Sequence, residues 1–460
     1  MKLGVLPLAR PTFDLDYAGQ NLAAMLARLD ATGHDIVGPR TFLLDDDMAR
    51  HAIRDLAVSG VEHVLILQGT FTDAGMASAA AVSFDQPLSI WAVPEPRLGG
   101  RLRLNSFCGL NLASHAFGRN GRRFSWLYID PNGDVAEDIA DLLAGEREPR
   151  VLDASTVPAP NPEGSRVAKA VRGRRIARIG EHPAGFDTCA YDPVEMKGLT
   201  GVEVDERVLD DLFDVARTVP DQGTDVLRAE TCKQLTGLDQ VDQAGLANSL
   251  RLKIGLEVLK SERGYDAFAI RCWPEMFTEF GGAVCGPAAM LGEDGVPCAC
   301  ESDVYGALTQ LVLQETAQAP VFLTDLVDID VKDDTGVVWH CGQAPLSMRD
   351  PEIRAEATIH SNRLQPLLYE FPLKPGPVTW MRISQAFNRP RIVLGFGEML
   401  RRPLPFSGTS GVIRFSRDAD DVLSDIISSG LEHHIAIAYG DHRPTLRGVA
   451  GALEMPLLEV

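Results

Sequence analysis

Short apolar runs alternate with longer amphipathic stretches along the first third of the chain. The run at residues 2–8 is apolar and is followed at 21–29 by apolar positions that recur at helical spacing. The run at 63–68 is apolar throughout its middle, as in a strand buried on both faces, and another strand-like run follows at 88–93. Strands that alternate with helices in this way predict βαβ units and a mostly parallel sheet.

A second segment of the same kind follows a stretch rich in Pro, Asn and Ser at residues 149–170. We interpret this stretch as a linker or domain crossing. Beyond it lie a helical pattern at 246–259, a strand pattern at 266–273 and a further helical pattern at 303–317. These patterns predict a second α/β domain, which we place at residues 166–345.

The pattern changes after residue 345, where short strand-like runs are separated by Pro, Gly and Asn with hardly any helix. Such spacing is typical of a small antiparallel barrel or sandwich. The predicted fold class is therefore α/β, with two Rossmann-like parallel-sheet domains at 1–165 and 166–345 and a C-terminal antiparallel β-barrel-like domain at 346–460.

Charge and apolar patterning exclude two classes of partner. The chain has 44 Lys and Arg residues against 64 Asp and Glu, giving a formal charge of −20, whereas proteins that track phosphates are normally basic. We therefore expect no nucleic-acid partner. No apolar stretch approaches the ~18 residues of a membrane-spanning helix, and the N-terminus has no signal-peptide core. With eight widely spaced cysteines, the sequence predicts a cytoplasmic protein without a membrane partner.

Four acids stand beside predicted strand ends between residues 269 and 308. Glu301 and Asp303 are two residues apart at the end of a predicted strand and so point to the same side of the sheet. Asp303 also suits the N-cap of the following helix. Glu275 and Glu279 are four residues apart, which places them on one face if the stretch is helical, and taken alone they are better explained by a solvated helix face. For Asp303 the residues leave the cap and a catalytic role equally open.

Three of the ten histidines, His433, His434 and His442, lie close together near the C-terminus. On a strand only one of the adjacent pair can face a given site. An imidazole with two carboxylates is a hard, mixed ligand set that suits Mn²⁺, Fe²⁺, Co²⁺ or Mg²⁺. His340 and His360 are further candidates, although a single histidine on an apolar strand is more often a core residue.

Several ordered motifs carry a family resemblance. The segments CWPEMFTEFG, VPCACESDVYGAL, WHCGQAP, FSGTSG and LEHHIAIAYGDH occur in this order. With them the chain resembles the L-fucose/L-arabinose isomerase-like family, mainly over residues 260–460 and more weakly over 106–116. The chain is shorter than typical members, which indicates a divergent branch whose sugar does not follow from the family.

The resemblance implies two α/β domains, a C-terminal β-barrel-like domain and a divalent metal, commonly Mn²⁺, held by two carboxylates and a histidine. The matching positions are Asp303 for the second carboxylate and His434 for the histidine. Glu279 has the better spacing for the first carboxylate, with Glu275 as its rival, while Glu301, His433 and His442 are secondary candidates. A homo-oligomer, trimeric or hexameric, with sites near subunit interfaces is also implied.

The resulting functional hypothesis is an aldose–ketose isomerase that acts on an open-chain sugar through an enediol intermediate. Glu279 and Asp303 would transfer the proton, and a deoxy, acidic or sulfonated sugar fits as well as fucose or arabinose. The alternatives are a non-catalytic sugar-binding or regulatory protein, and a metal-dependent epimerase or lyase on the same fold. Substrate contacts are expected from Trp273, His340, Gln343, Asn362, Gln68 and Trp91.

Overall fold

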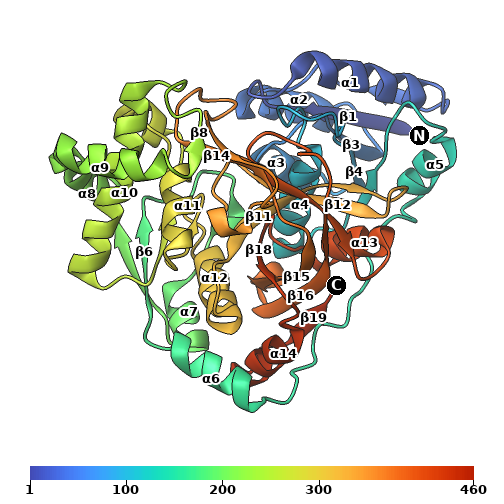
Figure 1. The fold of residues 1–460 in the computed structure, drawn as a ribbon. Helices are drawn as coiled ribbons and strands as arrows, with labels where there is room; N and C mark the ends of the chain where they lie inside the picture. Colours follow the sequence, from blue (N-terminus) through green and yellow to red (C-terminus); the bar gives the residue numbers. More distant parts are fainter.

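Three β-sheets organise the chain, and the computed structural model describes all residues from 1 to 460. The N-terminal elements, coloured blue, lie at the upper right of Figure 1, and the green and yellow elements of the second sheet lie at the left. The orange and red strands of the third sheet lie between and below them. The three sheets meet around a cavity that is lined by residues from all of them.

The N-terminal sheet is entirely parallel and has the strand order β2-β1-β3-β4-β5. This order reverses direction between β1 and β3, and open α/β sheets bind ligands at the carboxyl ends of the strands beside such a point. The apolar runs therefore form the predicted sheet. Its elements are β1 (Lys2–Leu8), α1 (Leu15–Asp30), β2 (Asp35–Val37), α2 (Asp46–Ala57), β3 (His63–Gln68), α3 (Ala74–Ser83), β4 (Leu88–Ala92), α4 (Ser106–Arg119), β5 (Ser125–Tyr128) and α5 (Ala136–Ala144).

The second sheet is also parallel, with the order β10-β9-β6-β7. The edge strand β10 pairs in parallel with β9, so the residues that follow these two strands lie at one edge of the sheet, beside the N-terminus of α12. The elements are α6 (Pro162–Val171), β6 (Arg175–Ile179), α7 (Pro193–Thr200), β7 (Glu203–Arg207), α8 (Leu209–Thr218), α9 (Asp221–Thr231), β8 (Leu235–Thr236), α10 (Gln243–Arg263), β9 (Ala267–Ile270), α11 (Cys285–Glu293), β10 (Cys298–Ala299) and α12 (Val304–Ala317).

The third sheet is mixed and largely antiparallel, with the order β19-β16-β15-β18-β11-β12-β17-β14-β13-β8 and an additional pairing of β16 with β17. Its description as a barrel stays a prediction. The elements are β11 (Phe322–Asp330), β12 (Thr335–His340), β13 (Ala355–Thr358), β14 (Leu368–Pro372), β15 (Gly376–Ser384), β16 (Arg391–Leu400), β17 (Thr409–Phe415), α13 (Ala419–Ser429), β18 (His434–Tyr439), α14 (Arg443–Ala452) and β19 (Leu457–Glu459).

Two strands join a different sheet from the one that the sequence prediction gave them. β11 and β12 fall within residues 166–345, yet they pair with β18 and β17 in the third sheet. An apolar run indicates that a strand is buried, but it does not indicate which neighbouring strand it is hydrogen-bonded to. The three-domain division itself stays a prediction.

Helix α4 joins the N-terminal part to the third sheet. Its residues are buried on every side. Asn111 Nδ2 donates to the Leu431 carbonyl at 2.6 Å, and His115 Nδ1 lies 2.8 Å from the Gly430 carbonyl. These two bonds tie the N-terminal domain to the segment that leads into β18. No helix of the structure combines the length and the apolar character needed to cross a membrane.

The buried His63 on β3 gives the fold a pH dependence. Burial lowers the pKa of His63 to about 4, with a smaller contribution from His34, and His63 Nε2 lies 2.7 Å from Ser89 Oγ. The unfolded chain, with an ordinary pKa near ~6.5, therefore binds more protons than the folded chain between about pH 4 and 6.5. Stability rises with pH across this window.

We expect the free energy of unfolding to fall between pH 7 and pH 5, with His63 contributing about 2 kcal/mol of the loss. Urea unfolding at both pH values measures it. His63→Gln removes the titrating group and should lose about 2 kcal/mol less than the wild type. Equal losses in the two proteins would contradict the assignment.

Candidate active site

A cavity of about 390 Å³ lies where the three sheets meet. It is lined from the carboxyl ends of β1 and β3, the loops after β9 and β10, strand β11 and the loops around residues 340 and 360. Its polar lining includes Glu301, Asp325, His340 and His433, and much of the remaining wall is aromatic, including Phe71, Phe186, Trp273, Phe277 and Trp339. Acids and histidines inside an apolar wall make this cavity the best candidate for an active site.

Glu301 enters the cavity from the loop after β10. Glu301 and Ser302 both adopt left-handed backbone angles, with φ of 56° and 55°, a strained conformation that is concentrated at functional sites. Trp273 Nε1 donates to Glu301 Oε1 at 3.1 Å, and His433 Nε2 donates to Glu301 Oε2 at 3.0 Å. Burial alone would raise the pKa of Glu301, but the hydrogen bond and charge of His433, with His434 and Trp273, lower it to about 2. Glu301 is therefore held as a carboxylate.

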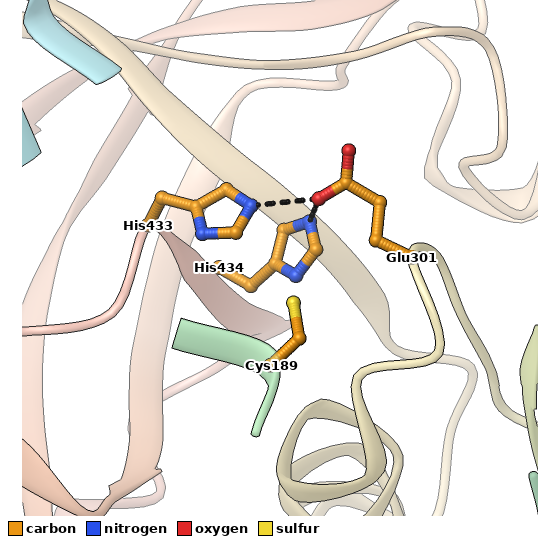
Figure 2. A group of neighbouring side chains, drawn as sticks. All are labelled: Cys189, Glu301, His433 and His434. Carbon is orange, nitrogen blue, oxygen red and sulfur yellow. Dashed lines mark hydrogen bonds and ion pairs between the residues drawn. The ribbon is translucent and has the colours of Figure 1, made fainter. Parts of the chain in front are cut away.

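His434 is the first residue of β18 and lies between three carboxylates. Its Nδ1 lies 2.9 Å from Asp303 Oδ2, while its Nε2 faces Glu301 Oε2 at 3.8 Å and Asp325 Oδ1 at 3.5 Å. Because the Nδ1–H of His434 donates to the Asp303 carboxylate, the lone pair of Nε2 is free to bind a cation. A carboxylate that orients the far nitrogen of a metal-binding histidine is a common arrangement. Figure 2 shows Glu301 beside both histidine rings, with Cys189 near His434.

Asp303 lies behind His434 and is fully engaged by the protein. It caps α12 by accepting from the Gly306 amide at 2.8 Å, and Arg382 donates to its two oxygens at 2.5 and 3.0 Å. Burial raises the pKa of Asp303, but the Arg382 charge and the His434 bond hold it well below its usual range. Asp303 thus orients His434 and has no oxygen open toward the cavity.

Asp325 on β11 supplies an acceptor that no protein group satisfies. Its Oδ1 is buried without a hydrogen-bond partner. Burial raises the pKa of Asp325 to about 7, against the lowering effect of His434. His434 belongs to two groups of side chains that could hold a metal ion, one with Asp325 and His340 and one with Cys189, Glu301 and His433. A cation at His434 Nε2 would satisfy Asp325 Oδ1, which lies 3.5 Å from that nitrogen, and Glu301 Oε2 faces the same nitrogen at 3.8 Å. This donor set of two carboxylates and one imidazole fits a hard divalent ion.

Comparison with known proteins identifies the family. Residues 4–173 match the family described as Fucose/sulfoquinovose isomerase, N-terminal domain. The sulfoquinovose isomerase of Priestia megaterium (strain ATCC 12872 / QMB1551) is 30% identical over 445 residues, which cover 95% of this chain and 94% of that protein. The chain belongs to this isomerase family. The sulfoquinovose isomerase of Alkalicoccus urumqiensis is likewise 30% identical, over 99% of this chain and 98% of its own length.

Membership of the fucose/sulfoquinovose isomerase family confirms the expectation of an aldose–ketose isomerase. The family match at residues 4–173 also covers the N-terminal part of the chain, where the sequence motifs gave only a weak resemblance. The chain is therefore an aldose–ketose isomerase.

Glu279, the residue expected to be the first carboxylate ligand, does not line the cavity. Glu279 lies on a π-helical turn, Met276–Phe280, and its side chain is exposed to solvent. Its rival Glu275 accepts from Arg271 Nε at 2.7 Å, and this bond lowers the pKa of Glu275. Neither Glu275 nor Glu279 lines the cavity, whereas the left-handed loop after β10 turns Glu301 into it.

Three predicted substrate contacts (Gln68, Trp91 and Gln343) and the secondary candidate His442 also lie outside the cavity lining. The Gln68 amide donates to the Thr70 carbonyl at 2.6 Å, and the Trp91 indole donates to the Ile129 carbonyl at 3.2 Å. The Gln343 amide donates to Leu323 at 3.2 Å, and His442 Nε2 lies 2.9 Å from the Tyr439 carbonyl. The Gln68 amide nitrogen, the Trp91 indole, the Gln343 amide nitrogen and His442 Nε2 thus each have a partner within the protein, whereas Gln68 Oε1 is buried without one. Trp273, His340 and Asn362 do line the cavity, as expected.

The sequence analysis did not identify four charged or amide side chains of the cavity, nor one buried arginine behind it. Asp325 is the first of three acids in the strand run Phe322–Asp330, and Arg10 lies two residues after the first strand; both were visible signals. The others gave no signal of their own, because their significance depends on neighbours distant in sequence. These residues are Asp325, Arg10, Asn105, Arg363 and, behind the cavity, Arg382.

Proposed function

We propose that this isomerase converts a sulfonated aldose, sulfoquinovose, into its ketose with the help of a divalent cation held by Glu301, Asp325 and His434. The observation that carries the metal site is the buried, unpartnered Asp325 Oδ1 that faces His434 Nε2 at 3.5 Å. The sugar follows from the relatives named above, which match over nearly the whole chain. Manganese is the expected ion, with cobalt, iron and magnesium as alternatives.

A cation bound there would act as a Lewis acid that polarises the carbonyl and draws charge from the neighbouring hydroxyl. The protein's own residues then handle the proton. Glu301, as a carboxylate that faces the cavity, accepts the proton from C2 of the open-chain sugar and returns it to C1. The proton of the O2 hydroxyl moves to O1, so that C1 becomes a hydroxymethyl group and C2 becomes the ketone carbon. His433 donates to Glu301 Oε2, and Thr188 Oγ1 lies 2.9 Å from its other ring nitrogen. This fixes the orientation of the carboxylate during the transfer.

The rest of the cavity suits a polyhydroxylated substrate. Asn105 Oδ1 and Asn362 Oδ1 are buried oxygens without partners in the chain, and both residues line the cavity. Sugar hydroxyls are donors that would satisfy them. The aromatic wall of Phe71, Phe186 and Phe277 excludes water from the reacting end.

Removal of the metal tests this proposal. We expect dialysis against EDTA to abolish conversion of sulfoquinovose, and added Mn²⁺ to restore it, with the ketose identified by NMR. In D₂O the product should carry deuterium at C1, since the proton passes through Glu301. Full activity in EDTA would contradict the metal site, and complete retention of the substrate's hydrogen would contradict proton transfer.

The proposal keeps three expectations from the sequence. They are a cytoplasmic location, a trimeric or hexameric assembly, and substrate contacts contributed by a neighbouring subunit. Light scattering on the purified protein measures the assembly directly.

A further inference from the structure

Two arginines line the cavity together with Glu301 and Asp325. Arg10 follows β1 at the point where the N-terminal sheet reverses its strand order, and its backbone amide donates to Thr70 Oγ1 at 2.8 Å. Arg363 lies in the loop between β13 and β14. Both belong to the cavity lining. The cavity is therefore not uniformly acidic, although the chain as a whole carries a charge of −20.

The Arg363 guanidinium has no hydrogen bond or ion pair with the protein, and its side chain is only partly exposed. Most other arginines that are not fully exposed are engaged, as Arg97 is with Asp328. A half-buried guanidinium presents five donors that need acceptors. An unpaired one facing a cavity indicates that the acceptor comes from a ligand.

Arg10 is paired with Asp73, which also caps α3 by accepting from the Gly75 amide at 2.9 Å. This pair fixes the direction of the Arg10 side chain at the sheet edge. Only one of its terminal nitrogens bonds to Asp73, so the remaining donors of the fork are available to an anion.

Trp273 connects the basic and acidic parts of the cavity. The Arg10 guanidinium carbon lies 5.9 Å from the centre of the indole ring, and that of Arg363 lies 5.8 Å from it. The indole nitrogen of the same ring donates to Glu301 Oε1 at 3.1 Å. One side chain therefore separates both guanidiniums from the carboxylate to which the proton transfer is assigned.

From this arrangement we infer that Arg10 and Arg363 bind the sulfonate group of the substrate, an inference that rests on the proposed function. A sulfonate is ionised throughout the physiological pH range and offers three acceptor oxygens to guanidinium donors. In sulfoquinovose it occupies C6, at the opposite end of the open chain from the C1 and C2 carbons that react. The two arginines thus hold the tail of the sugar while its head lies at Glu301.

Arg363→Met tests the assignment, because methionine keeps the apolar stem and removes the charge. The expected result is a rise of about 10- to 100-fold in KM for sulfoquinovose, with a much smaller change in kcat. Arg354→Met is the matched control: Arg354 is exposed, forms no ion pair and lies outside the cavity. An unchanged KM in Arg363→Met, or a fall in kcat alone, would overturn the inference.

A second measurement needs no turnover. Titration with ethanesulfonate at constant ionic strength, followed by tryptophan fluorescence, should show binding to the wild type and to Arg354→Met. It should weaken by about 10-fold or more in Arg363→Met and in the charge-balanced Arg10→Met/Asp73→Asn variant. If ethanesulfonate binds in this manner but sulfoquinovose is not converted, the proposed function fails while the anion subsite stands. Equal binding by all four proteins would overturn the subsite.

Discussion

Glu301→Gln is expected to lower kcat by about 100- to 10,000-fold while the protein stays folded. Glutamine keeps the size of the side chain and can still accept from Trp273, which donates to Glu301 at 3.1 Å. It cannot accept a proton from the sugar, and it is a poorer partner for a divalent cation than a carboxylate. Steady-state kinetics with sulfoquinovose and excess Mn²⁺ give the effect, and circular dichroism checks the fold.

Glu279→Gln is the matched control for this prediction. Glu279 carries the same functional group, lies in the same motif block and is exposed on its π-helical turn. We expect its variant to keep kcat within about 3-fold of the wild type, since surface substitutions away from a site have small effects. If Glu279→Gln lost activity and Glu301→Gln kept it, the assignment of the carboxylate would be wrong.

Arg382→Met is expected to destabilise the fold by about 3–5 kcal/mol, the cost of leaving a buried charge without its partner. The Arg382 side chain on β15 is 0% exposed, and it pairs with Asp303 at 2.5 Å and with Glu432 at 3.8 Å. Its removal leaves both carboxylates buried without a cation. The midpoint of urea unfolding measures the loss.

Arg402→Met provides the comparison, because the Arg402–Asp333 pair is 43% and 38% exposed. Such surface pairs contribute about 0–1 kcal/mol. Since Asp303 also orients His434, Arg382→Met should lose activity as well as stability. A loss of stability no larger than in Arg402→Met would show that the buried network is not what holds Asp303.

The alternating pattern of apolar and amphipathic segments determined the two parallel sheets, because strands buried on both faces and their crossover helices have distinct periodicities. It did not determine the membership of β11 and β12. Their sequences show that they are buried, but their partners β18 and β17 lie roughly 70–110 residues further along the chain. Backbone hydrogen bonding between such distant strands leaves no local sequence signature.

The candidate site divides in the same manner. The motif around His434 led to a histidine that lies at the centre of the cluster, and Asp303 was found at the helix N-terminus that its alternative interpretation predicted. Spacing favoured Glu279 over Glu275 as the first carboxylate and left Glu301 a secondary candidate, yet the two left-handed residues after β10, Glu301 and Ser302, direct Glu301 into the cavity. The left-handed backbone conformation of these two residues cannot be deduced from the spacing of acids in the sequence.

By itself, the sequence determined the chain's class of fold, its likeness to sugar isomerases and the histidine at the centre of the site. Only the tertiary structure decided which carboxylates face that histidine, that Arg382 neutralises Asp303, and that Arg10 and Arg363 line the same cavity. The physical reason is that helices and strands depend mainly on residues that are close in the sequence. The site instead forms when folding brings charged side chains from four separate segments within a few ångströms of one another.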